Sequence, residues 1–256
     1  MKIASWNVNS LNVRLPHVLA WCDAAAPDIL ALQETKLTDD RFPVEPLQEA
    51  GYQSAFSGQK TYNGVAILSR EPLRDAVTDI PGLDDPQRRI LAATIGDVRL
   101  VNLYVVNGSE VGSEKFDYKL NWLEKVTEWL AGEMAAHPNL VVVGDFNIAP
   151  DDRDVYDPDA WREKILCSTP EREALGRILD LGLEDTFRLF DQEDRVFSWW
   201  DYRMNMFRRK MGLRIDLVLA SPAMARRCTA SYIDIEPRRQ ERPSDHAPAI
   251  AEFGPA

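Results

Sequence analysis

Leu140-Val141-Val142-Val143-Gly144-Asp145-Phe146-Asn147 is an apolar run that ends in two polar side chains. A short apolar run bounded by turn-forming residues predicts a β-strand. The same pattern occurs at 29–34, where the run Ile-Leu-Ala-Leu-Gln ends in Glu34. In the apolar run 215–220 the acidic residue, Asp216, lies near the start instead. Functional groups commonly lie where strands end, because the loops there are held by a rigid scaffold. We therefore expect a β-rich scaffold with polar groups gathered at its strand ends.

The rest of the chain alternates further strands with a few helices. A helix is expected from Pro16 to the residue before Pro27, and two more at 116–136 and about 170–181. Further strands are expected at 1–9, 64–68, 90–95, 99–104, 196–200 and 249–253. Strands that cluster between a few helices, in two halves of similar design, predict an α/β fold. We expect two β-sheets packed face to face with helices outside.

The composition is that of an ordinary globular protein. The chain has 256 residues, of which 45% are hydrophobic and 28% charged, a length that fits one large α/β domain or two small ones. No low-complexity linker divides it, so we expect a single domain over 1–256. No membrane span or signal peptide is apparent. Cys22, Cys167 and Cys228 are too widely spaced for a disulfide framework or a zinc site. We therefore expect a cytoplasmic protein without a membrane partner.

Charge is unevenly distributed along the chain. The formal net charge of −11 by itself argues against a nucleic-acid partner. The segment 203–214, however, has five basic residues and no acid, whereas the segment 151–159 has five aspartates. An acidic site rimmed by basic loops is typical of a metal-dependent enzyme that acts on an anionic substrate. Ordinary solvated surface is the alternative for either segment.

Acidic residues and one histidine mark several strand ends. Besides Glu34, Asp145 and Asp216, the pair Asp245-His246 precedes the last expected strand. A single acid at such a place is commonly a turn former or a helix cap, but the recurrence in one domain favours a site. Oxygen donors of this kind suit Mg²⁺ or Mn²⁺ better than zinc.

The motifs of the chain resemble, in order and over nearly its whole length, the exonuclease III class of abasic-site endonucleases and 3′-end processing nucleases. Each motif alone is weak, but together they are specific. They are Trp6-Asn7-Val8-Asn9-Ser10, Leu32-Gln33-Glu34-Thr35-Lys36, Gly58 to Ala66, Gln87-Arg88-Arg89-Ile90, Gly144-Asp145-Phe146-Asn147-Ile148, Asp201-Tyr202-Arg203, Gly212 to Asp216 and Pro243-Ser244-Asp245-His246-Ala247-Pro248. The resemblance implies a four-layer α/β sandwich, in agreement with the strand and helix pattern.

The resemblance also implies a metal site. Glu34 would be the principal Mg²⁺ ligand, with Mn²⁺ as a possible substitute. Asn7 would support it, and so would Asp245. The metal-binding set would further include Asp145 and Asn147.

Catalytic roles are implied for five residues. Asp145 would orient and deprotonate the attacking water, while Asn147 would steady the phosphate. Tyr104 would contact the phosphate or the leaving oxygen. His246 would bind a non-bridging phosphate oxygen, with Asp216 holding its imidazole as a cation. These roles suit phosphodiester hydrolysis, in which charge builds on the phosphate oxygens.

Five further residues are candidates for contact with DNA. Arg88 resembles a family segment beside the DNA backbone, and Arg203 lies in the basic segment. Asn107 belongs to the loop after Tyr104. Of the two adjacent tryptophans, at most one should line the pocket if they lie in a strand, and we select Trp199, although core packing is the alternative for both. Leu166 would border the nucleotide pocket and narrow it.

The leading hypothesis is therefore a Mg²⁺-dependent, monomeric DNA repair enzyme of base excision repair. It would cut duplex DNA 5′ to abasic sites, or trim nucleotides and blocking phosphates at nicks and recessed 3′ ends. One alternative is a relative on the same scaffold that hydrolyses small phosphate esters, which the basic segment 203–214 disfavours. The other is a DNA-binding module with a decayed site, which is disfavoured because each catalytic position holds a competent residue.

Overall fold

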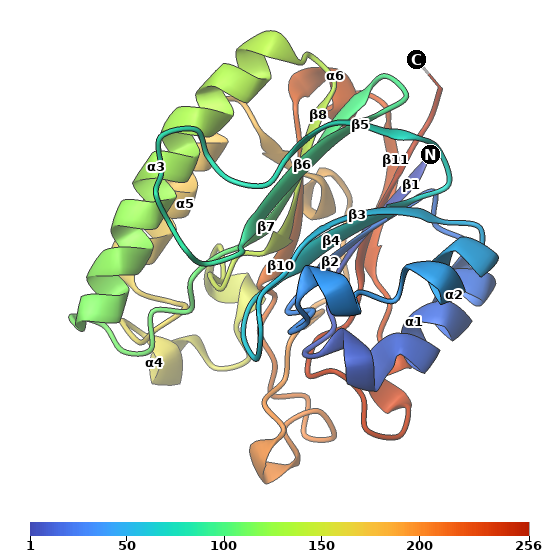
Figure 1. The fold of residues 1–256 in the computed structure, drawn as a ribbon. Coiled ribbons are helices and arrows are strands. Elements are labelled where there is room, and N and C mark those ends of the chain that lie inside the picture. Colours follow the sequence, from blue (N-terminus) through green and yellow to red (C-terminus); the bar gives the residue numbers. More distant parts are fainter. Residues whose placement is uncertain (256) are drawn as a thin grey trace.

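A computed structural model describes residues 1–255 of the chain. Two six-stranded sheets pack face to face, with α3 and α5 covering one side and α1 and α2 the other (Figure 1). This four-layer arrangement confirms the predicted α/β sandwich. Among the described helices, none is both long and apolar enough to cross a membrane.

The elements have the following bounds. The first sheet has the order β11 (Cys228–Ile233), β12 (Ala249–Phe253), β1 (Lys2–Asn7), β2 (Ile29–Gln33), β4 (Val65–Ser69) and β3 (Gln53–Ser57). The second has the order β5 (Leu73–Val77), β6 (Ile90–Ile95), β7 (Val98–Tyr104), β8 (Leu140–Asp145), β10 (Asp216–Ala220) and β9 (Glu184–Asp185). The α-helices are α1 (Leu11–Ala25), α2 (Val44–Glu49), α3 (Glu114–Ala136), α4 (Pro158–Trp161), α5 (Thr169–Leu179) and α6 (Pro222–Ala225). Short 3₁₀ turns lie at Asp39–Arg41, Asp152–Asp154, Thr186–Leu189, Arg203–Asn205 and Glu236–Arg239.

The strand β8 shows how the layers are held together. Each of its side chains is buried, as in a strand with both sheet faces covered. Because side chains alternate along a strand, Val142 packs toward α3 and α5, whereas Val141 and Val143 pack toward the first sheet. The outer face of the first sheet forms a third apolar cluster with α1 and α2.

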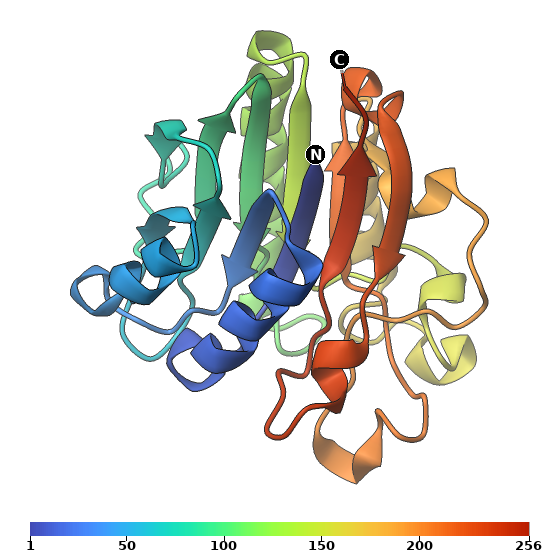
Figure 2. The ribbon, with the colours of Figure 1, turned by 90° about the vertical axis from the view of Figure 1, so that its right-hand side faces the viewer.

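Strand direction brings the expected site residues to one edge of both sheets. The pairs β1–β2 and β7–β8 are parallel, so their carboxyl ends lie at the same edge. The strand β10 is antiparallel to β8, so Asp216 at its start lies opposite Asp145 at the end of β8. Both chain ends lie at the opposite edge from the loop around 203–210, which projects from the molecule (Figure 2).

Two predicted elements are wrong in detail. Residues 196–200 do not form a strand; Trp199 makes only isolated β-bridges to Leu213 and His246. Single β-bridges between loops hold this segment. Its apolar composition is the same as that of a regular strand, so the sequence pattern could not tell the two apart. Pro16 lies inside α1 rather than in its first turn, because the helix already begins at Leu11.

Candidate active site

A buried amide joins the two sheets at their common edge. Asn7, the last residue of β1, donates from Nδ2 to Glu34 Oε1 at 3.0 Å and to Asp145 Oδ2 at 2.9 Å. The oxygen of the same amide accepts the backbone N–H of Asn9 at 2.9 Å. Asn7 and Asp145 are almost fully buried. Three residues from distant parts of the sequence are therefore fixed relative to one another.

Glu34 is further held by a phenol and an ammonium group. Tyr104, at the end of β7, donates to Glu34 Oε1 at 2.8 Å, and Lys36 Nζ lies 2.9 Å from Oε2. Burial raises the pKa of Glu34, but Lys36 and the hydrogen bonds outweigh this effect, and the pKa lies below its usual value. Glu34 is therefore a carboxylate at neutral pH. Its left-handed backbone, with φ of 52°, is typical of strain held at a functional site.

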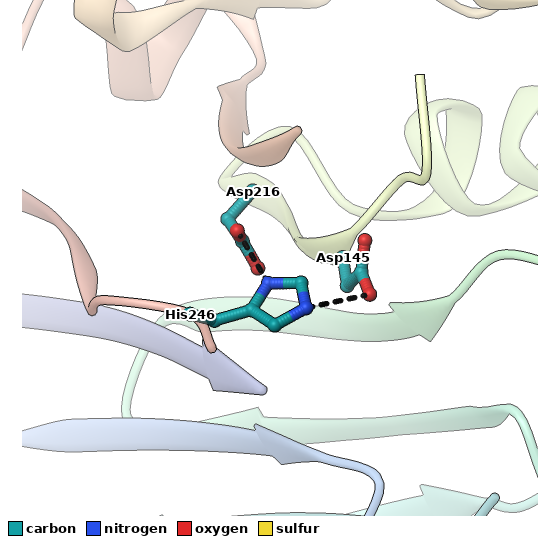
Figure 3. Close-up of side chains that lie close together, drawn as sticks. All are labelled: Asp145, Asp216 and His246. Carbon is teal, nitrogen blue, oxygen red and sulfur yellow. Dashed lines mark hydrogen bonds and ion pairs between the residues drawn. The ribbon is translucent and has the colours of Figure 1, made fainter. Parts of the chain in front are cut away.

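His246 lies between two buried carboxylates (Figure 3). Its Nδ1 is 2.9 Å from Asp216 Oδ2, and its Nε2 is 3.7 Å from Asp145 Oδ2. Burial alone would lower the pKa of His246, but Asp216 and then Asp145 raise it to about 10. Burial is also the main reason that the pKa of Asp145 is raised to about 7, against the opposing effect of His246. The imidazole is therefore cationic at neutral pH, and Nε2 is too far from Asp145 for a hydrogen bond.

Asn147 closes the turn after β8. Its backbone is left-handed, with φ of 49°, and its N–H donates to Asp145 Oδ1 at 2.9 Å. The side-chain Nδ2 donates to the Val105 carbonyl at 3.0 Å and to Asp145 Oδ2 at 3.2 Å. Asn107 Nδ2 donates to Asn147 Oδ1 at 3.0 Å. The structure thus brings Asn147 to Asp145, as it does Asn7, and it brings Asn107 to Asn147.

Asp245 reaches the site indirectly. Its Oδ1 accepts Asn9 Nδ2 at 3.0 Å and its Oδ2 accepts the indole N–H of Trp199 at 3.1 Å. Within residues 1–255 no hydrogen bond joins Asp245 to Glu34. Leu166 is buried in a small apolar cluster against which Trp199 packs, so these two predicted pocket residues lie together.

The two adjacent arginines after Gln87 have different environments. Arg88 pairs with Asp79 at 2.8 Å and is partly exposed. Arg89 is buried, with its guanidinium carbon 4.6 Å from the centre of the Tyr104 ring, and it donates to the Tyr104 carbonyl at 3.1 Å. Sequence reasoning selected Arg88 and missed Arg89, and it also missed Lys36. Both missed residues lie within the motifs. Only its burial distinguishes Arg89 from Arg88, and only its contact with Glu34 marks Lys36.

The acidic segment 151–159 is not part of the site. Asp151, Asp152, Asp154 and Asp159 each pair with an arginine, and Asp157 accepts the Ala160 N–H at the start of α4. The interpretation of this segment as an acidic site rimmed by basic loops is wrong here, since four of its five carboxylates pair locally with arginines.

The basic segment is also partly paired. Arg203 is exposed and pairs with Asp201, and Arg214 is buried between Asp154 and Asp185 at 2.6 and 2.7 Å. Among the described residues, no ion pair involves Arg208, Arg209 or Lys210. These three exposed residues, which we call the basic tip, are the part of the segment available to an anionic partner.

The donor chemistry at the edge fits a hard divalent cation. Glu34 and Asp145 offer carboxylate oxygens on either side of the Asn7 amide, and such oxygens are the ligands that Mg²⁺ prefers. Asp145, Asp216 and His246 form a second compact group whose potential ligand atoms lie within 4.8 Å of one another. There, however, His246 Nδ1 already contacts Asp216, and the cationic imidazole has no free lone pair to offer a metal ion. The Glu34 side is the better candidate for a metal ion.

Known proteins resemble the chain over nearly its whole length. The model of the Endonuclease/Exonuclease/phosphatase family matches residues 4–246. The chain is 37% identical to exodeoxyribonuclease III of Haemophilus influenzae over 267 residues, covering 99% of this chain and 100% of the relative. A structure of the Neisseria 3′ phosphatase NExo, bound to a product DNA hairpin, matches with 53% identity and a TM-score of 0.97, covering 99% of each chain. An AP endonuclease from Archaeoglobus fulgidus matches with 38% identity and a TM-score of 0.95, also covering 99% of each chain.

Proposed function

The chain belongs to the Endonuclease/Exonuclease/phosphatase family, and we propose that it is a DNA repair phosphodiesterase of the exonuclease III type. The observation that carries the proposal is the Asn7 amide, which holds Glu34 and Asp145 together beside the cationic His246. This arrangement offers a metal-binding carboxylate, a base and a phosphate-binding cation within one buried edge. Such a combination suits hydrolysis of a phosphate ester.

The residues take the following roles in hydrolysis. Asp145 orients the attacking water and accepts its proton, for which a pKa of about 7 is well matched near neutral pH. His246 binds a non-bridging phosphate oxygen through Nε2, while Asp216 holds the opposite ring nitrogen. Asn147 steadies the phosphate, and Tyr104 contacts the phosphate or the leaving oxygen.

A divalent metal ion completes the site, and we propose Mg²⁺, with Mn²⁺ as a substitute. Glu34 would be its principal ligand, and Asn7 would support it by holding Glu34 and Asp145 in place through Nδ2. Asp145, Asn147 and Asp245 form the wider set of oxygen donors around it. When bound, the ion would offset negative charge on the phosphate and the leaving oxygen.

Duplex DNA with abasic sites, nicks or recessed 3′ ends is the proposed substrate. Asn107 and Trp199 would contact the nucleotide, while Arg88 and Arg203 would bind backbone phosphates. Leu166 narrows the pocket rim, and we propose that removal of 3′ phosphates and nucleotides exceeds abasic cleavage. The 53% identity to a protein described as a 3′ phosphatase supports the proposal that 3′-end processing is the stronger activity. The DNA enzymes found by comparison also favour DNA over small phosphate esters.

We further propose that the chain acts as one catalytic domain over 1–256, as a monomer and in the cytoplasm. The support for one domain is that each sheet contributes catalytic residues, Asn7 and Glu34 from the first and Asp145 from the second. The support for a reducing compartment is the wide spacing of the cysteines, of which Cys22 and Cys167 are buried and unpaired.

A paired assay with Mg²⁺ tests this function. One duplex carries an internal abasic-site analogue and the other a recessed 3′ end with and without a 3′ phosphate. We expect Asp145→Asn to remove activity on both, whereas the control Asp97→Asn, at the opposite edge of the sheet, keeps it. Release of phosphate from an inositol phosphate, with none from either duplex, would contradict the proposal.

A further inference from the structure

A buried ion pair lies directly behind the turn that carries Asn147. Lys119 of α3 and Glu171 of α5 have no exposed side-chain surface, and their charged groups are in direct contact. The hydrolytic roles above use neither residue. Because removing two charges from water is costly, a buried pair is weak evidence of stability and calls for another reason to be retained.

The ammonium group of Lys119 holds two loops of the site. Besides Glu171, Nζ donates to the Asn147 carbonyl at 2.7 Å and to the Asn107 carbonyl at 3.1 Å. Its three protons are therefore all used. The side chains of the same two asparagines are hydrogen-bonded to each other. Gly108 allows this close approach, since a Cβ there would lie 3.1 Å from Lys119 Cδ.

The carboxylate of Glu171 holds the loop that carries Leu166, the residue proposed for the pocket rim. Its Oε1 accepts the Leu166 N–H at 3.1 Å, and its Oε2 accepts the Ser168 N–H at 3.1 Å and the Ser168 hydroxyl at 2.6 Å. The bonds to Ser168 form the cap at the start of α5. That cap explains Glu171 in part, but it explains neither Lys119 nor the bond to Leu166.

The two residues at the ends of this network have strained backbones. The φ of Asn147 is 49° and that of Leu166 is 72°, in the left-handed region that side chains other than glycine rarely adopt. Such conformations persist only where surrounding contacts hold them. Here Lys119 holds the carbonyl of Asn147 and Glu171 holds the amide of Leu166, so one ion pair supports both.

We propose that Lys119 and Glu171 are positioning residues, which fix the phosphate-binding Asn147 and the Leu166 rim in one geometry. The inference rests on the proposed function, because it concerns how that site is held. Neither residue touches the substrate. Loss of the pair should therefore lower the rate of the bound complex more than its affinity for DNA.

The test compares the loss of the Lys119–Glu171 ion pair with the loss of an ion pair far from the site. The variants are Glu171→Gln, which keeps a carbonyl acceptor, and the double variant Lys119→Met/Glu171→Gln. The matched control is Arg99→Met/Glu133→Gln, since buried Arg99 and partly buried Glu133 form a pair at 2.7 Å toward the opposite edge of the second sheet. For each we would measure melting temperature, kcat and KM on a 3′-phosphate duplex, and backbone hydrogen exchange.

We expect kcat of the double variant to fall about 10- to 100-fold, the scale of misplacing a reacting group, with KM changed by less than about threefold. Hydrogen exchange should rise at 145–149 and 164–168 in this variant and not in the control. Glu171→Gln should show the same local exchange, and because it leaves the buried Lys119 without its counter-charge, it should lower the melting temperature at least as much as the double variant does. Either variant alone is enough for the test. Equal losses of kcat and melting temperature in the two double variants, without local exchange, would overturn the proposal.

If the wild-type protein hydrolyses neither DNA substrate, the proposed function is wrong. Pair-dependent exchange at 145–149 and 164–168 would then still support the positioning role, and its absence would overturn that role as well.

Discussion

Replacement of Asp216 by Asn tests the electrostatics of the site most directly. The Asp216 carboxylate lies 2.9 Å from His246 Nδ1, and at an effective dielectric constant of about 20 this contact is worth about 6 kcal/mol. Since 1.36 kcal/mol corresponds to one pH unit, losing the charge should lower the pKa of His246 from about 10 to near 6. The amide of Asn can still accept a hydrogen bond, so the ring orientation should be kept.

The sign of the effect sets the pH dependence. Because the pKa of His246 is raised in the wild-type protein, its imidazole stays cationic until the pH approaches about 10. In Asp216→Asn the cation would be lost near neutrality, so the variant should be about 10-fold slower at pH 7 and about 1,000-fold slower at pH 9. Deprotonation of Asp145, whose pKa is about 7, limits the wild-type protein on the acid side.

The assay is kcat/KM for release of phosphate from a 3′-phosphate duplex between pH 6 and 10, at saturating Mg²⁺. Asp97→Asn is the control, because Asp97 pairs with Arg227 at the opposite edge and should leave the profile unchanged. A ratio of wild-type to Asp216→Asn activity that is the same at pH 7 and pH 9 would refute the reasoning. Asp216 would then act by packing or orientation and not by charge.

Three further predictions follow from the same geometry. Glu34→Gln should lower the Mg²⁺-dependent rate at least about 100-fold, or about 3 kcal/mol, and a Mg²⁺ titration that is unchanged from wild type would contradict it. Asp154→Ala should lower the free energy of unfolding in urea by about 3–5 kcal/mol, because it leaves the buried Arg214 short of a partner; a loss below about 1 kcal/mol would show that the pair is not needed. Serine at all three positions of the basic tip (208–210) should raise KM for duplex DNA and leave kcat unchanged. The slope of log affinity against log salt concentration should become shallower by about 0.9 for each phosphate that is no longer bound, and an unchanged slope would show that DNA does not contact the basic tip.

Much of the fold could be predicted because its signals are local. The buried strands β2, β4, β7 and β8 read as apolar runs, and polar residues such as Glu34 and Asp145 mark where they end. The strands that were missed are β3, β5, β9 and β11, which are the edge strands of the two sheets. An edge strand is partly exposed, and Arg74 and Asp75 of β5 show no apolar run. Its place depends on a neighbour that the local pattern does not contain.

The residue types of the site and their order could be predicted from the chain alone, because these side chains lie in short motifs at the ends of strands. Which of them meet depends on how distant segments pack against one another. The Asn7 amide joins Glu34 to Asp145 through parallel strand pairs in two different sheets, and Lys119 reaches Asn147 from a helix whose periodicity only marks a buried face. Tertiary structure also separated Arg89 from Arg88, and it removed the acidic segment 151–159 from the site by pairing it with arginines. Periodicity reports burial along one segment, whereas the partner of a buried charge is set by whichever distant segment packs opposite it.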